Sequence, residues 1–320
     1  MSPRKPRSKL GIVVARTLLG MVAAAATSVV LVGQFGRGHH TLDQFNSALS
    51  LLLPVLAVTL AGSLRLRDRA GIAVAVLGLM VGGYQLGGAA LTGIGRPGPA
   101  PGETIKVMTY STFHANPDPA AVARVITAEA PDVAVLQETN GTPALIMDGL
   151  LPGYARIRSC LQPHCSLTIL SRWPMRRIEP GWQPKLQRPD VLVGEIDGPA
   201  GPFRIIDLHM PRPYDVTAQR LLAITGALAR DHAGTPLIVA GDFNTATGSF
   251  GLARFARISG LRRVDGFIPT YPADQVFPAF AGIDHVFTSL HWARGGCHRT
   301  AAGQSDHYGI ACRIGLRAPR

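Results

Sequence analysis

Charged residues are scarce in this sequence, and acidic residues are almost missing from its first hundred positions. Only 16% of the residues are charged and 47% are hydrophobic, which is an unusual balance for a purely soluble protein. Residues 1–100 carry ten basic side chains against only Asp43 and Asp68, a net charge of +8. The other +4 of the total +12 falls on residues 101–320. That is too little to indicate the continuous basic groove of a nucleic-acid-binding protein.

Three long apolar stretches occupy the acid-poor region. They cover about residues 10–33, 48–64 and 70–94, and each approaches or exceeds the roughly 20 residues that cross a bilayer core. With almost no acidic residue they lack the polar face of a core helix in a soluble domain. The sequence therefore predicts a transmembrane region of three helices within residues 1–94. A cleaved signal peptide is the alternative for the first stretch, which begins basic and contains small residues.

Basic residues flank these stretches unevenly, and this predicts the orientation of the chain. A cluster lies before the first stretch and another between the second and third: Arg4, Lys5, Arg7 and Lys9, then Arg65, Arg67 and Arg69. The positive-inside rule places both clusters in the cytoplasm and everything after the third stretch outside it. We therefore expect a multi-pass protein of the cytoplasmic (inner) membrane, in contact with the lipid bilayer. Its C-terminal part would be periplasmic or extracytoplasmic.

A linker rich in proline and glycine, residues 95–103, separates this region from residues 104–320, where short strands and helices alternate. We expect helices over Pro119–Ala130, with Asp118 as N-cap, and over Asp215–Arg230. The expected strands are Ile105–Tyr110, Val133–Leu136, Leu167–Leu170, Val191–Ile196, Phe203–Leu208, Leu237–Ala240, Ile283–Phe287 and Tyr308–Cys312. Because some strands follow one another directly, this order predicts an α/β layered domain with mixed sheets.

Polar side chains gather at the ends of these strands. They are Glu138, His209, Asp242, Asn244, Asp284, Asp306 and His307. In Gly-Asp-Phe-Asn, a carboxylate can take a proton from water while the carboxamide holds the water or a phosphate. If the strand ends face one way, the carboxylates suit Mg²⁺, Mn²⁺ or Ca²⁺ rather than zinc. His285 follows Asp284 on a strand and points to the opposite face, so we expect it to be structural.

In this order, the motifs resemble those of the endonuclease/exonuclease/phosphatase superfamily, over about residues 104–315. The segments that carry the resemblance are Val107–Tyr110, Pro131–Glu138, Ile169–Arg172, Asp207–His209, Gly241–Asn244, Ile283–Phe287 and Ser305–His307. Membrane-anchored bacterial members are the most similar. The resemblance implies a four-layer sandwich of two mixed β-sheets flanked by helices, after an N-terminal membrane region.

The resemblance also implies a metal site and a base. Glu138 would hold Mg²⁺ (or Mn²⁺) and Asp306 would assist. Asp242 would orient and deprotonate the attacking water, and Asn244 would help to place that water.

Two histidines would complete this site. His209 would donate to a phosphate oxygen, while His307, backed by Asp284, would stabilise the charge that develops on phosphorus. The implied activity is metal-dependent phosphoester hydrolysis of the phosphodiesterase or nuclease type. The substrate stays open between a nucleic acid, a phospholipid headgroup and a soluble phosphodiester, and no protein partner is deducible.

One position departs from the family. An asparagine usually follows the first strand, and this chain has Ser111 there, whose hydroxyl reaches less far. We expect Asn116 to be a substitute and Arg172 to be a further phosphate contact, although an arginine anchoring a turn is an equal reading. The alternative function is a non-catalytic, membrane-tethered binding or scaffold protein on the same fold.

All four cysteines follow residue 104, and an even number in an exported domain suggests disulfides. Of the three pairings, we favour Cys160–Cys165 and Cys297–Cys312, the second of which would bracket Asp306 and His307. The alternative is a zinc site with His164 and His298, but the cysteine pairs lack C-x₂-C spacing.

Overall fold

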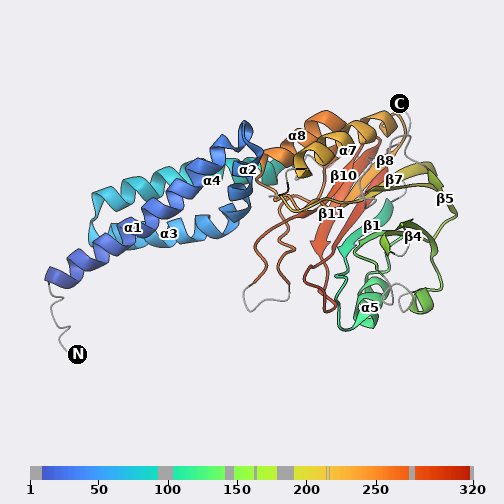
Figure 1. The fold of residues 1–320 in the computed structure, drawn as a ribbon, viewed down its shortest axis with the longest axis horizontal. Helices are drawn as coiled ribbons and strands as arrows, with labels where there is room; N and C mark the ends of the chain where they lie inside the picture. The colour runs from blue at the N-terminus through green and yellow to red at the C-terminus, as the bar shows by residue number, and fades with distance from the viewer. Residues whose placement is uncertain are drawn as a thin grey trace. The chain divides into compact units, whose positions relative to one another are not determined.

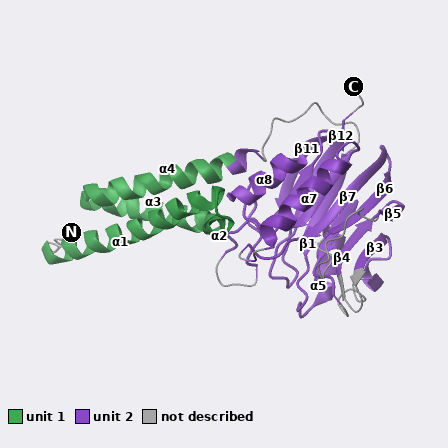
Figure 2. Cartoon of the chain, turned by 45° about the horizontal axis from the view of Figure 1, so that its top comes forward, with its two compact units in different colours: residues 1–88 green, residues 89–320 purple. Residues whose placement is uncertain are grey.

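The chain forms two compact units, Met1–Gly88 and Ala89–Arg320 (Figure 2). The structure, a computed structural model, describes the following residues: 9–92, 104–140, 148–161, 164–178, 191–213, 215, 217–273 and 278–317. The predicted linker, residues 95–103, lies outside the described residues.

Long helices build the N-terminal part of the chain: α1 (Lys9–Gln34), α3 (Leu49–Leu66) and α4 (Arg69–Thr92). Short turns of helix, η1 (Phe35–Arg37), α2 (His40–Asp43) and η2 (Gln44–Ala48), connect α1 to α3. Three helical segments of this part are long and apolar enough to cross a membrane. The three segments, Lys9–Arg37, His40–Leu66 and Arg69–Thr92, overlap the three predicted stretches, and the second begins earlier than predicted because short helical turns precede α3.

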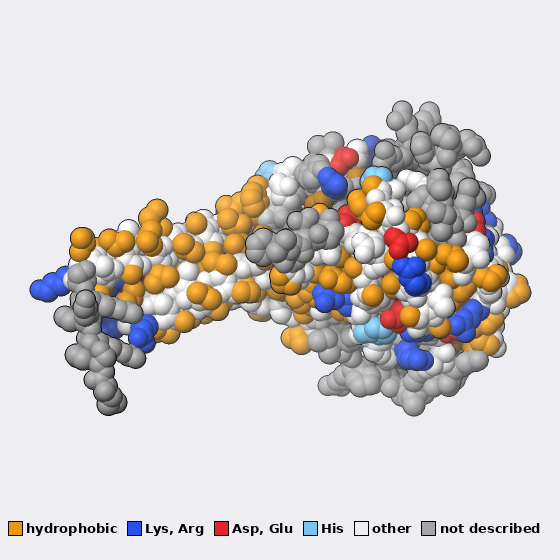
Figure 3. Space-filling model, turned by 90° about the horizontal axis from the view of Figure 1, so that it is seen from below, with side chains coloured by type: hydrophobic (Ala, Val, Ile, Leu, Met, Phe, Trp, Pro, Cys, Tyr) orange, Lys and Arg blue, Asp and Glu red, His pale blue; other side chains and the backbone are white. Residues whose placement is uncertain are grey.

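The surface of these helices is apolar. Almost all of the exposed large hydrophobic side chains in the described part of the chain lie on them, for example Leu18, Val58 and Met80. Figure 3 shows such side chains along the visible face of the helices. Arg16, the one charge inside the first stretch, donates from Nε to the backbone oxygen of Leu66 at 3.0 Å. These helices thus present mainly apolar side chains on their surface.

Two six-stranded mixed sheets form the second unit (Figure 1). The first sheet has the order β11-β12-β1-β2-β4-β3, with bounds Trp292–Arg299, Ile310–Leu316, Thr104–Ser111, Val133–Gln137, His164–Ser171 and Ala155–Leu161. The second has the order β5-β6-β7-β8-β10-β9, with bounds Met175–Ile178, Val191–Gly198, Gly201–His209, Leu237–Asp242, Asp284–Thr288 and Arg262–Arg263. Each sheet contains one parallel pair, β1 with β2 and β7 with β8, and its other pairs are antiparallel. The predicted mixed sheets are therefore confirmed.

Alternating side chains divide the apolar interior into layers. On β8, Ile238 and Ala240 belong to the core between the two sheets, whereas Leu237 and Val239 face a different cluster. That second cluster packs the outer face of the second sheet against α7 (Ala218–His232) and α8 (Phe250–Ser259). On the other side, α5 (Pro119–Glu129) covers β1 and β2. The order helix, sheet, sheet, helix follows from the period-2 pattern of strands that are apolar on both faces.

Side-chain hydrogen bonds to the backbone determine where α5 and α7 begin. Asp118 caps α5, as predicted, by accepting a hydrogen bond from the backbone N–H of Ala121 at 3.2 Å. The helix expected from Asp215 begins at Ala218 instead, because Asp215 accepts hydrogen bonds from the backbone and hydroxyl of Thr217 and so forms a turn before the helix. The sequence analysis missed β3, β5, β9, β11 and α8.

A disulfide joins Cys297 on β11 to Cys312 on β12, which confirms that predicted pair. The two residues are register partners across the antiparallel pair, so the bond closes the loop that carries Asp306 and His307. Cys160 and Cys165 are also register partners, on β3 and β4, but their side chains lie outside those that the structure describes. This second disulfide stays a prediction.

Candidate active site

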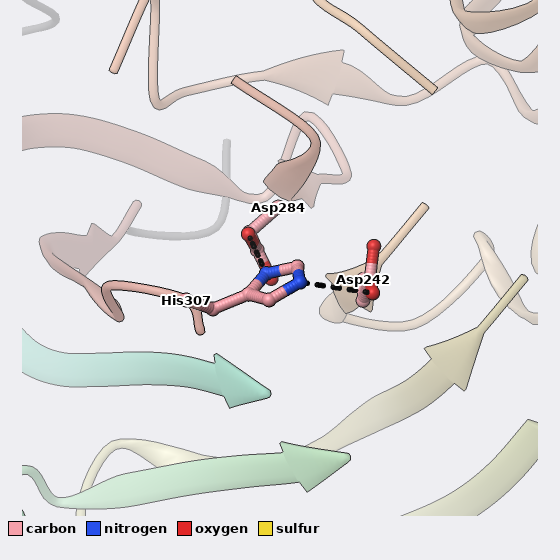
Figure 4. Close-up of side chains that lie close together, drawn as sticks. All are labelled: Asp242, Asp284 and His307. Carbon is pink, nitrogen blue, oxygen red and sulfur yellow. Dashed lines mark hydrogen bonds and ion pairs between the residues drawn. The ribbon is translucent and has the colours of Figure 1, made fainter. Parts of the chain in front are cut away.

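The predicted polar residues converge because strand ends of both sheets meet at one edge. Glu138 follows β2 of the first sheet, and His209 and Asp242 end β7 and β8 of the second. Since β10 runs antiparallel to β8, it begins at this edge, and Asp284 is the register partner of Asp242. His307 reaches the same edge from the loop before β12 (Figure 4).

Asp284 and His307 form a buried carboxylate–imidazole pair. His307 Nδ1 lies 2.9 Å from Asp284 Oδ2, and the other ring nitrogen, Nε2, points toward Asp242 Oδ2 at 3.9 Å (Figure 4). The loop that carries His307 is held in place by Ser305, whose hydroxyl donates to the backbone oxygen of Ser111 at 2.8 Å. The same hydroxyl accepts the N–H of His307 at 3.1 Å. Asp284 therefore orients the imidazole through Nδ1, and Nε2 points into the site.

Asp242 is almost completely buried, and its two oxygens differ in their surroundings. Oδ1 accepts the backbone N–H of Asn244 at 2.7 Å, while Oδ2 faces His307 Nε2, as well as His209 Nε2 at 3.7 Å. The side chain of Asn244 donates to the backbone oxygen of Met210 at 2.8 Å and lies 3.3 Å from Asp242 Oδ2. One carboxylate oxygen thus anchors the turn and the other is turned toward two imidazoles.

His209 connects the two sheets at the site. Its Nε2 lies 3.7 Å from Asp242 Oδ2 and also 3.7 Å from Glu138 Oε1. Both distances exceed a direct hydrogen bond. These groups converge on a common space without binding one another directly, an arrangement suited to a small polar guest such as a phosphate oxygen or a water molecule.

Left-handed backbone conformations aim several of these side chains. Glu138, Asn244 and Phe113 have φ angles of 58°, 47° and 62°. Asparagine adopts this region readily, whereas glutamate and phenylalanine do so at a cost of about 1–2 kcal/mol. Gly241 has a φ angle of 152°, and a Cβ there would lie 2.0 Å from the backbone oxygen of Leu208. The turn that presents Asp242 therefore requires glycine, and strain is concentrated around the polar cluster.

Burial and neighbouring charges shift the pKa values of the two central groups upward. Burial raises the pKa of Asp242, and the negative charges of Asp284 and Glu138 add to this, while His307 and the N–H of Asn244 oppose it, with a net pKa of about 8. Burial lowers the pKa of His307, but the carboxylates of Asp284 and Asp242 outweigh burial and raise it to about 10. His307 is therefore an imidazolium at neutral pH, and Asp242 has the affinity for a proton that a general base needs.

The pKa of Glu138, in contrast, is lowered. Burial raises its pKa, but the backbone N–H and ring of His114, together with the charge of His209, outweigh burial and hold the pKa below its usual range. Its Oε2 accepts from His114 N at 3.0 Å and from His114 Nδ1 at 2.7 Å. Glu138 is therefore an ionised carboxylate with Oε1 directed into the site.

One cluster of three residues and one further carboxylate, that of Glu138, offer ligand atoms for a metal ion. Asp242, Asp284 and His307 each have one such atom within 4.8 Å of the others. His307, however, is protonated and already bonded to Asp284, and an imidazolium does not bind metal. Glu138, ionised and with one oxygen facing the site, is the better ligand for a hard divalent cation.

Two other predicted site residues are Ser111, which ends β1, and Asp306, which precedes His307 in the sequence. Ser111, the register partner of Gln137, has a buried hydroxyl with no hydrogen-bond partner among the residues that the structure describes. Asp306 is half-buried, and its charge contributes to the raised pKa of His307. A buried hydroxyl without a hydrogen-bond partner is consistent with a ligand at Ser111.

The structure corrects two predicted substrate contacts. Asn116 does not substitute for an asparagine at position 111, because its Nδ2 donates to the backbone oxygens of Thr112 and Gly303 and its Oδ1 accepts the N–H of Asp118. Its whole amide is engaged in holding the loop.

Arg172 lies at the wrong end of the sheet for a phosphate contact. It donates to the backbone oxygens of Pro131 and Ala130, which precede β2, whereas Glu138 follows β2. A five-residue strand at about 3.3 Å per residue separates the two ends by roughly 16 Å. Arg172 anchors the turn between α5 and β2, which was the alternative reading.

His285, expected to be structural, is completely buried, with Nδ1 2.9 Å from Asp265 and Nε2 3.0 Å from the backbone oxygen of Thr245. The sequence analysis missed His114, which contacts Glu138, and the buried pair in which Gln137 Nε2 donates to Asp207 Oδ1 at 2.6 Å between the two sheets. Both Gln137 and Asp207 lie within segments that carry the family resemblance, Pro131–Glu138 and Asp207–His209, but neither was assigned a role. No local pattern marks His114, since a turn places it.

Comparisons with known proteins agree with the predicted family and fold. The pattern of the Endonuclease/Exonuclease/phosphatase family matches residues 108–307. No curated protein matches the chain. A solved endonuclease/exonuclease/phosphatase from Beutenbergia cavernae DSM 12333 is 22% identical with a TM-score of 0.54, over 67% of this chain and 72% of that one.

Two further solved structures share the fold. A family protein from Bacteroides vulgatus is 15% identical with a TM-score of 0.58, covering 68% of this chain and 100% of the other. TDP2 of D. rerio, complexed with single strand DNA product, is 14% identical with a TM-score of 0.55, covering 67% of this chain and 100% of the other. At these identities the likeness establishes the fold alone.

Proposed function

This chain belongs to the endonuclease/exonuclease/phosphatase family, whose members are generally metal-dependent phosphoester hydrolases, and we propose that it hydrolyses a phosphodiester. The observation that carries the proposal is the convergence of Glu138, His209, Asp242 and His307 at distances of 3.7–3.9 Å, with opposite charges directed at one space. Phosphoryl transfer depends mostly on positioning and charge neutralisation, and this cluster supplies both.

Asp242 would accept the proton of the attacking water. Its Oδ1 is held by the backbone N–H of Asn244, which leaves Oδ2 for the water, and its raised pKa gives it the basicity that proton transfer near neutral pH needs. The carboxamide of Asn244, 3.3 Å from Oδ2, would help to keep the water in line.

The two imidazoles would bind the phosphate. His307 is held protonated by Asp284 and directs Nε2 into the site, where it would donate to an oxygen that gains negative charge in the transition state. His209 lies between the carboxylates of Glu138 and Asp242 and would donate to a second phosphate oxygen.

Glu138 and Asp306 would hold a divalent metal ion, which we propose to be Mg²⁺ or Mn²⁺. Carboxylate oxygens are the ligands that these hard cations prefer. When bound, such a cation supplies Lewis-acid polarisation of the phosphate and neutralises its charge.

Hydrolysis of bis(p-nitrophenyl) phosphate by the full chain in detergent, with Mg²⁺ or Mn²⁺, tests the enzymatic proposal. Asp242→Ala is the inactive variant, and Asp265→Ala, which removes a buried carboxylate paired to His285 outside the site, is its control. We expect Asp242→Ala to lower kcat by about 10²–10⁴-fold, the usual contribution of a general base. Equal rates for wild type and Asp242→Ala would favour the non-catalytic binding protein instead, a reading that Ser111 at the asparagine position supports.

We also propose that the first 94 residues anchor the protein in the cytoplasmic membrane and that the second unit faces outward. The apolar surfaces of α1, α3 and α4 and the basic residues at Arg65–Arg69 support this topology. Fusions of alkaline phosphatase and of green fluorescent protein to the C-terminus check it. Activity of the phosphatase without fluorescence is expected, and the reverse pattern would contradict the orientation.

The physiological substrate class needs a direct screen. On the face drawn in Figure 3, the Lys and Arg side chains of the second unit are scattered among Asp and Glu rather than forming a continuous band. TDP2 of D. rerio, a structural relative, is complexed with single strand DNA product, which keeps a nucleic acid among the candidates. Single-stranded DNA, sphingomyelin vesicles and phosphoinositides, each with Mg²⁺, are the three arms of the screen.

A further inference from the structure

His114 is exposed over 61% of its side chain, yet it is bound to the most important carboxylate of the proposed metal site. Its backbone N–H and its ring Nδ1 lie 3.0 Å and 2.7 Å from the same oxygen, Oε2 of Glu138. Because an ionised carboxylate only accepts hydrogen bonds, Nδ1 must carry its proton and donate it. Two donors from one residue therefore occupy Oε2.

A strained turn places His114 in this position. Phe113 has the left-handed φ angle of 62°, which directs both N–H groups of the next residue back toward Glu138. Asn116 holds the turn by donating its amide to the backbone oxygens of Thr112 and Gly303 and its backbone N–H to that of Phe113. The local cost of the left-handed phenylalanine indicates that the geometry is maintained by its surroundings.

The two hydrogen bonds distinguish the oxygens of Glu138. Oε2 is saturated by His114, while Oε1 faces His209 Nε2 at 3.7 Å on the site side. Residues that bond to a metal ligand in this way orient it and tune its affinity for the metal. Ser111 does not bond to Glu138, because its hydroxyl has no hydrogen-bond partner among the described residues.

We propose that His114 is a positioning residue that fixes Glu138 for metal binding, so that the loop after β1 supplies from position 114 an orientation that Ser111 does not provide. The inference rests on the proposed function, since it assigns Glu138 as a metal ligand. It also explains how the site tolerates serine at position 111: the support of the carboxylate comes from the turn rather than from the strand end.

The test measures Mn²⁺ binding by isothermal titration calorimetry on the full chain in detergent, for wild type, His114→Ala and His114→Asn. Asparagine places its Nδ2 close to the position of the histidine Nδ1 and so keeps the donor. We expect His114→Ala to bind Mn²⁺ about 10-fold more weakly, the lower end for such supporting residues, because the backbone N–H persists. We expect His114→Asn to stay within about 3-fold of wild type, since the charge-assisted hydrogen bond is retained.

His298→Ala is the matched control. His298 is also an exposed histidine paired with a glutamate, with Nε2 3.0 Å from Glu129 Oε2, and 55% of its side chain is exposed. Its removal should leave Mn²⁺ affinity unchanged. The proposal is overturned if His114→Ala binds Mn²⁺ as wild type does, or if His114→Asn binds as weakly as His114→Ala.

The same titration separates this inference from the enzymatic proposal. If wild type binds Mn²⁺, His114→Ala weakens binding and neither protein hydrolyses a phosphodiester, the positioning role stands and the enzymatic function fails. If hydrolysis requires Asp242 but His114→Ala binds Mn²⁺ with the affinity of wild type, the enzymatic function stands and the positioning role fails. Absence of Mn²⁺ binding by wild type at millimolar concentration would refute both.

Discussion

The substitution Asp284→Asn tests whether the buried pair with His307 controls catalysis through protonation. Asp284 Oδ2 lies 2.9 Å from His307 Nδ1, and its charge is the largest influence that raises the pKa of His307 to about 10 from the ordinary 6.5. That difference corresponds to about 5 kcal/mol in favour of the imidazolium. Asparagine keeps the shape of the side chain but removes the charge.

The expected effect depends on pH. If the pKa of His307 returns to 6.5, about 3% of the imidazole is protonated at pH 8 and about three quarters at pH 6. The loss of kcat/KM from this cause is then about 30-fold at pH 8 but less than 2-fold at pH 6.

Hydrolysis of bis(p-nitrophenyl) phosphate at both pH values, with Mg²⁺ and the full chain, measures the effect. Asp265→Asn is the control, since Asp265 and His285 form a similar buried pair at 2.9 Å outside the site, and its losses should be independent of pH. Histidine NMR gives the pKa of His307 directly. Equal losses for Asp284→Asn at pH 6 and pH 8, or an unchanged His307 pKa, would refute the reasoning.

Three stability predictions follow from other buried positions. Burial raises the pKa of Asp207 well above its usual 3.8 in the folded state, so its contribution to stability falls as pH rises above 3.8. Asp207→Asn should therefore be more stable than wild type at pH 8, but not at pH 3.5, in thermal denaturation. Cys297→Ser removes the bond to Cys312 across a separation of 15 residues, and urea denaturation without reductant should show a loss of about 3 kcal/mol relative to wild type. Gly241→Ala would place a Cβ 2.0 Å from the backbone oxygen of Leu208, so thermal denaturation should show a large loss of stability, and an unchanged midpoint would contradict the required turn.

Three of the side chains that the structure brings together could be predicted from the sequence, because each follows or ends a short strand. Glu138, His209 and Asp242 come directly after or at the end of apolar runs, and those runs form β2, β7 and β8. The sequence did not show at which edge of the sheet each strand ends. Arg172 also follows an apolar strand, but β4 runs antiparallel to β2, so its end lies at the opposite edge from Glu138.

Which carboxylate pairs with which histidine also became clear only from the tertiary structure. Asp284 and His285 are neighbours in sequence, yet alternation on β10 directs one to His307 and the other to Asp265. The partner of Asp284, His307, is 23 residues away in the sequence and lies within the loop that the Cys297–Cys312 disulfide closes. His114 gave no signal at all, because its contact with Glu138 depends on a left-handed turn at Phe113.

The sequence alone determined that the chain has three helices apolar enough for a membrane, a layered α/β unit, and a family-specific order of polar residues at strand ends. These properties depend on composition and short-range periodicity, which the residues express locally. Only the tertiary structure decided at which edge of the sheet each strand ends, which carboxylate pairs with which imidazole, and that His114 bonds to Glu138 while Asn116 bonds to the loop backbone. Those outcomes depend on strand direction and on contacts between residues far apart in the chain, and no local pattern encodes them.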